Sequence, residues 1–75
     1  MARIVSTFEV EDCNQALAQA GLPTRVHLHD ACGGQFFSWD SLGERDAEVR
    51  ETAEHFFSNK GIKLEFVGDS SFRTR

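Results

Sequence analysis

Residues 26–37 read Val26-His27-Leu28-His29-Asp30-Ala31-Cys32-Gly33-Gly34-Gln35-Phe36-Phe37, a stretch with the pattern of a β-hairpin. Polar and apolar side chains alternate at its start, as they do in a strand with one buried face. Gly33 and Gly34 suit a tight turn, and an aromatic segment from Gln35 to Trp39 returns as the second strand. The rest of the predicted fold is built around this hairpin.

The faces of the two hairpin strands are predicted from the alternation. Val26 and Leu28 face the core, and three side chains face the other way: Arg25, His27 and His29. In the returning strand Phe36, Phe37 and Trp39 cannot all point the same way. One large ring is therefore expected on the open side of the sheet or at its edge.

Two helices flank the hairpin in the sequence. Ser6 and Glu9 form a capping box, which predicts a helix over about Thr7–Ala20. Ser41 and Glu44 offer a second box near the start of the second helix. Apolar side chains recur at helical spacing and mark the buried faces: Val10, Cys13, Leu17 and Ala20 in the first helix, and Val49, Ala53, Phe56 and Phe57 in the second.

Three further β-prone segments complete the predicted order: Ala2–Val5, Ile62–Phe66 and, as an optional last strand, Phe72–Thr74. The order β-α-β-β-α-β(-β) predicts one α+β domain over residues 1–75, with two helices packed on one antiparallel sheet in a ferredoxin-like, split βαβ arrangement. In this topology the first helix starts at the end of the sheet that carries the hairpin turn. Cys13 could therefore approach Cys32.

The composition is that of a soluble globular domain. Of the 75 residues, 40% are hydrophobic and 27% are charged, and no apolar run approaches the length of a membrane span. The net charge of −4 argues against a binder of nucleic acid or anionic membranes, which needs a basic patch. With no targeting segment recognised and two cysteines that we interpret as thiols, we expect a cytoplasmic protein.

Side chains that can ligate a metal crowd the hairpin, which raises a metal site as one hypothesis. His27 and His29 share a strand face, Cys32 lies in the turn beyond them, and Cys13 could complete the set. Nitrogen and sulfur ligands suit zinc, copper(I) or iron, although the spacing matches no structural-zinc pattern. The alternative is a surface strand with solvated histidines and a turn cysteine, so no cofactor is assigned.

Thiol chemistry is a second hypothesis, centred on Cys32. Turn amides and a nearby imidazolium would make this thiol more reactive, whereas the carboxylate of Asp30 would oppose that. A nucleophilic pair with His29 or a redox disulfide with Cys13 is conceivable. The sequence offers no oxyanion hole and no orienting third residue, so an enzyme is the less favoured class.

The favoured function is a binding module that uses the hairpin turn to hold a ligand, a metal or a protein partner. Its candidate ligand-binding residues lie close together in the chain: Asp30, Cys32, Gly33, Gly34 and Gln35. A structural or oligomerising domain is the alternative, because a second copy often covers an open sheet face or edge strand in so small a protein. Phe36 or Trp39, whichever is exposed, would then anchor a homodimer.

The segment His29-Asp30-Ala31-Cys32-Gly33-Gly34-Gln35 resembles the signature of the RDAC family of small bacterial proteins. These are named for an Arg-Asp-Ala-Cys sequence at a strand end, followed by Gly-Gly-Gln and an aromatic strand. His29 stands where the family has its arginine, so the role of that arginine does not carry over. The resemblance implies a similar helix, hairpin, helix, strand layout and adds weight to the turn as a site, but it implies no activity.

Overall fold

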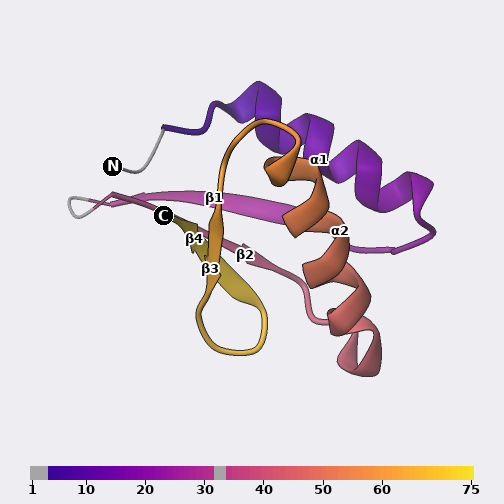
Figure 1. The fold of residues 1–75 in the computed structure, drawn as a ribbon. Helices are drawn as coiled ribbons and strands as arrows, with labels where there is room; N and C mark the ends of the chain where they lie inside the picture. The colour runs from indigo at the N-terminus through magenta and orange to yellow at the C-terminus, as the bar shows by residue number, and fades with distance from the viewer. Residues whose placement is uncertain (1–3, 32–33) are drawn as a thin grey trace.

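The computed structural model describes residues 4–31 and 34–75, which form two helices packed on a four-stranded antiparallel sheet (Figure 1). This confirms the predicted α+β class. The elements follow the chain in the order α1 (Thr7–Gln19), β1 (Val26–Ala31), β2 (Gly34–Trp39), a 3-10 turn η1 (Gly43–Arg45), α2 (Asp46–Ser58), β3 (Leu64–Phe66) and β4 (Ser71–Thr74).

The strands lie in the order β1-β2-β4-β3, so β1 and β3 are the two edges of the sheet. The predicted hairpin is confirmed, with β1 and β2 paired from Val26 opposite Trp39 to Ala31 opposite Gly34. The optional last strand is present as β4, which lies between β2 and β3 and pairs with both. Its central position makes it an integral part of the sheet.

The segment predicted as a first strand, Ala2–Val5, is only partly described. Ile4 and Val5 lie outside the sheet, and Ala2 lies outside the described residues. The backbone N–H and C=O of Val5 bond to the side chain of Gln35 rather than to a neighbouring strand. The ferredoxin-like arrangement depends on this first strand, so it stays a prediction.

Both helices end in the same way, and α1 begins as predicted. The Ser6 hydroxyl accepts from the Glu9 amide at 3.2 Å while the Glu9 carboxylate accepts from the Ser6 amide at 3.0 Å. Gly21 and Gly61 follow the two helices with φ of 77° and 75°, a conformation that favours glycine. The amide that follows each glycine donates back to a helical carbonyl and closes the helix, from Leu22 to Leu17 at 3.0 Å and from Ile62 to Phe57 at 2.9 Å.

The start of α2 differs from the prediction. Ser41 and Glu44 form no capping box, and the buried carboxylate of Asp46 takes this role instead. It accepts hydrogen bonds from the Trp39 indole N–H at 3.0 Å, the Ser41 hydroxyl at 2.6 Å and the Leu42 amide at 2.7 Å. These donors, led by the Ser41 hydroxyl, lower the pKa of the Asp46 carboxyl.

The core lies between the helices and one face of the sheet and is dominated by aromatic rings. Phe37, Phe57 and Phe72 are fully buried, and the rings of Phe37 and Phe72 stack with centroids 4.9 Å apart. Trp39 is also buried, whereas Phe36 is 44% exposed. Phe36 is therefore the ring that the strand pattern placed on the open side of the sheet.

Candidate functional site

The chain entering α1 is held at the end of the hairpin where β1 stops and β2 starts (Figure 1). The side-chain amide of Gln35 accepts from the Val5 N–H at 2.7 Å and donates to the Val5 C=O at 2.8 Å. This confirms that the start of α1 and the hairpin turn share one end of the sheet. Both polar groups of Gln35 thus serve to hold this segment.

The other predicted ligand-binding residues are only partly described. Asp30 and Gly34 are exposed at the ends of β1 and β2. Cys32 and Gly33 lie outside the described residues, so their roles in ligand binding or thiol chemistry stay predictions.

Two large apolar side chains are exposed where the chain enters α1. Ile4 is 74% exposed and Phe8 is 75% exposed, the two highest values among the exposed large hydrophobic residues described. Sequence reasoning missed both. Phe8 lies about 200° around the helix from Val10, so its exposure could have been predicted from the periodicity. Ile4 gave no such signal because its segment was assigned to a strand.

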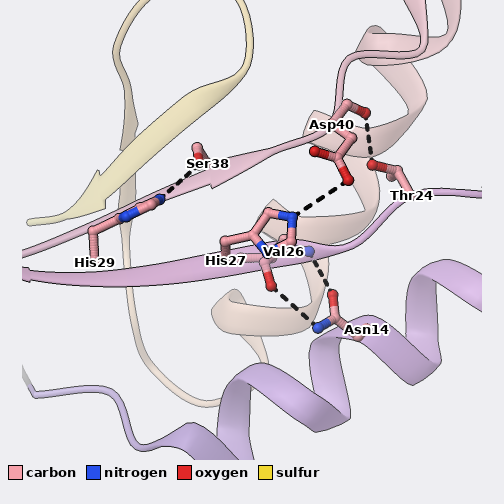
Figure 2. Close-up of polar contacts among 7 residues, drawn as sticks. All are labelled: Asn14, Thr24, Val26, His27, His29, Ser38 and Asp40. Carbon is pink, nitrogen blue, oxygen red and sulfur yellow. Dashed lines mark hydrogen bonds and ion pairs between the residues drawn. The ribbon is translucent and has the colours of Figure 1, made fainter.

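The two histidines of β1 lie on the open face of the sheet, as predicted, but they face different partners (Figure 2). His27 Nε2 is 3.3 Å from a carboxylate oxygen of Asp40, and His29 Nε2 is 2.9 Å from the Ser38 hydroxyl. The His29 ring also stacks on Phe36, with centroids 5.0 Å apart. The two imidazoles therefore do not converge on one point.

Cys13 does not join the histidines. It is fully buried in the core between α1 and the sheet, on the opposite side of β1 from His27 and His29. Burial raises the pKa of its thiol to about 12, so the thiolate needed for a metal or a nucleophile is not formed near neutral pH. Across residues 4–31 and 34–75, no three His, Cys, Asp or Glu side chains are grouped as a metal site.

The outer edge of β1 is covered at one position by α1. The Asn14 side chain accepts from the Val26 N–H at 2.6 Å and donates to the Val26 C=O at 3.2 Å (Figure 2). It imitates the edge of a neighbouring strand. Because edge groups alternate along a strand, the N–H and C=O groups of Leu28 and Asp30 point outward on this same side.

A shallow groove of about 320 Å³ lies between α1 and Arg25, the residue that precedes β1. It is lined by Glu11, Asn14, Gln15, Ala18 and Arg25. The alternation predicted Arg25 on the open face with the histidines, which is wrong. Arg25 precedes β1, where the strand geometry has not begun, so its side chain turns toward the helix.

These features define a small α+β domain with an exposed apolar end and a partly covered sheet edge. Among the described residues, neither helix is long and apolar enough to cross a membrane. No protein-family model, no curated protein and no solved structure matches the chain. The resemblance to the RDAC family therefore stays a prediction.

Proposed function

We propose that the protein is a protein-interaction module, and that it contacts its partner with the hairpin end, the surface that carries Ile4, Phe8, Asp30 and Gly34. The exposure of Ile4 and Phe8 carries the proposal. Large apolar side chains left in water favour burial against another molecule, at about 25 cal/mol per Å² of apolar area covered.

The position of this surface supports the proposal. The Gln35 amide fixes the backbone of Val5 at two points, and the capping box fixes the start of α1 one residue later. Ile4 and Phe8 are therefore presented from a backbone that is already ordered, which lowers the entropic cost of binding. The free, buried thiol of Cys13 fits a reducing location, and we place the module in the cytoplasm.

The test is to select ligands without assuming a partner. A displayed library of random peptides is selected on the immobilised protein, and the bound ligands are mapped by amide chemical shifts. We expect shifts at residues 4–8 and 30–35, and at least a tenfold loss of affinity for Phe8→Ser. Val67→Ser is the matched control, because Val67 is an exposed apolar residue next to the opposite edge strand. Ligands that bind Phe8→Ser and the wild type equally contradict the proposal.

Self-association through the open sheet face is a second candidate, favoured by Phe36. Its ring is 44% exposed and, with His29 stacked on it, offers an aromatic surface on the side of the sheet away from the helices. Sedimentation over a wide concentration range tests it. A dimer that Phe36→Ser converts to monomer supports this function, and a monomer at every concentration removes it.

A further inference from the structure

Among the described residues, part of the outer edge of β1 is covered and part of it is open to an added strand. Asn14 occupies the backbone groups of Val26, which leaves those of Leu28 and Asp30 as the outward-facing groups further along β1. An added strand can therefore form its main-chain bonds at these two residues and not at Val26. The register of any such strand follows from this restriction.

The groove beside α1 continues the same edge. Beyond Asn14, in the direction of Arg25, an added strand would leave β1 and lie in the groove of about 320 Å³. Glu11 precedes Asn14 by about one helical turn, so it lies on the hairpin side of the covered position. The outer edge of β1 and the groove beside α1 together form one continuous surface, called the track below.

Charge is distributed unevenly along this track. Asp30 alternates with Val26 and Leu28, so it faces the helix side and adds to the negative charge of Glu11 near the hairpin end. Arg25 stands at the other end. Neither Glu11 nor Arg25 makes an ion pair with the described part of the chain, and both charges are available to a ligand.

A second copy of the chain does not suit this track. Pairing β1 with its own copy about a two-fold axis would bring the two Glu11 side chains and the two Asp30 side chains toward one another. Like charges that close oppose association. A peptide with a cation near its amino end and an anion near its carboxyl end complements the track when it runs antiparallel to β1.

We infer that the partner of the proposed interaction module contributes an extended peptide, which adds to the outer edge of β1 as an antiparallel strand and enters the groove beside α1. The inference rests on the proposed function. The cation of the peptide faces Glu11 and Asp30, and its anion faces Arg25. Asp30 and Arg25 are five positions apart, about 16 Å, and both face the helix side. Because side chains alternate along a strand, two peptide charges on that side must be an even number of residues apart, and six residues, about 20 Å, span the distance. Main-chain bonds supply affinity and the charges supply direction.

Two blocked peptides test the inference. The first has lysine near its amino end, glutamate six residues later on the same face, and alternating valine and threonine between them. The second has the two charges exchanged. We expect the first peptide to bind at least tenfold more tightly in a fluorescence anisotropy titration. It should slow hydrogen exchange of the Leu28 and Asp30 amides at least tenfold. Arg25→Glu should abolish or reverse the preference, whereas Lys63→Glu beside the other edge strand should leave it unchanged.

The other outcomes of these measurements decide whether the edge inference, the proposed function or both are wrong. Equal or reversed binding of the two peptides, or unchanged exchange at Leu28 and Asp30, overturns the inference. A dimer that protects these two amides without peptide overturns it in favour of a second copy. If the peptides fail while ligands sensitive to Phe8→Ser still bind, the edge inference falls and the proposed function stands. If the peptides bind as expected but no selected ligand responds to Phe8→Ser, the hairpin-end function falls and the edge site stands.

Discussion

Replacing Asn14 by alanine should destabilise the protein through a single backbone contact. The amide makes two hydrogen bonds to Val26, at 2.6 and 3.2 Å, in a partly buried position. Each such bond has a net worth of about 0.5–1.5 kcal/mol, and the Val26 groups left without a partner add to the loss. Alanine recovers up to about 0.7 kcal/mol through its better helix propensity. We expect a net loss of about 1.5 kcal/mol in the free energy of unfolding.

This loss is large for a chain of this size. A domain of 75 residues is stable by about 4–11 kcal/mol, so Asn14→Ala removes an easily measured share. The melting temperature should fall by about 6–12 °C, at about 4–8 °C for each kcal/mol. Urea unfolding followed by circular dichroism should show a lower midpoint and an unchanged slope, because the surface exposed on unfolding stays the same.

Two comparisons make the result interpretable. Gln15→Ala changes the next residue of α1, which is exposed, and should alter stability by less than about 0.5 kcal/mol. Asn14→Asp keeps an acceptor for the Val26 N–H but loses the donor to the C=O, so its stability should lie between wild type and Asn14→Ala. If Asn14→Ala unfolds at the same urea concentration as Gln15→Ala, the bonds to Val26 do not hold α1 on the sheet edge.

Three further predictions concern other contacts. Gln35→Ala should lower the free energy of unfolding by about 1–2 kcal/mol and speed hydrogen exchange at the Val5 amide. The losses from Gln35→Ala and Asn14→Ala should add to within about 0.5 kcal/mol in the double variant, and a larger coupling energy would show that the two contacts are not independent. Because hydrogen bonds lower the pKa of Asp46 from its usual 3.8, the stability that its carboxylate contributes should be complete above about pH 5 and should fade as the pH falls through 3.8 and below. The urea midpoint of Asp46→Asn should therefore change less with pH than that of the wild type. Parallel profiles of the two proteins would refute this. In a Cys32→Ser variant, the Cys13 thiol should react with a disulfide reagent at pH 8 only after unfolding, and rapid reaction of the native protein would show that it is accessible.

Local sequence signals predicted most of the fold. The capping box at Ser6, the apolar stripes of both helices and the alternation in β1 each depend on residues a few positions apart. Such patterns indicate which backbone groups and faces need partners. The structure supplies most of these partners, but Ala20, predicted in the buried stripe of α1, lies past the last residue of the helix and is exposed. The same reasoning required one aromatic ring on the open side of the sheet, and Phe36 is that ring.

Contacts between distant segments could not be predicted in this way. Asn14 and Val26 are 12 residues apart, and Val5 and Gln35 are 30 residues apart. Ile4 and Val5 both favour a strand, but the backbone of Val5 bonds to the side-chain amide of Gln35 instead of to a neighbouring strand, so tertiary contact overrides propensity. At the start of α2, Asp46 replaces the predicted Ser41–Glu44 box, and its carboxylate also accepts from the Trp39 indole at the end of β2.

The two edges of the sheet are protected to different degrees, and this contrast supports a role for β1 in binding. An unpaired edge is an aggregation hazard that proteins reduce with short strands, charges or covering groups. The edge strand β3 has three residues, whereas β1 has six. Within residues 4–31 and 34–75, the side-chain amide of Asn14 covers the first position of β1 and no other group covers the rest. A purely structural edge of that length would gain from further cover, which residues of α1 nearer its start could supply. Instead Glu11 lies on that side, and no described residue covers the outward backbone groups of Leu28 and Asp30, as the proposed binding of a peptide strand requires.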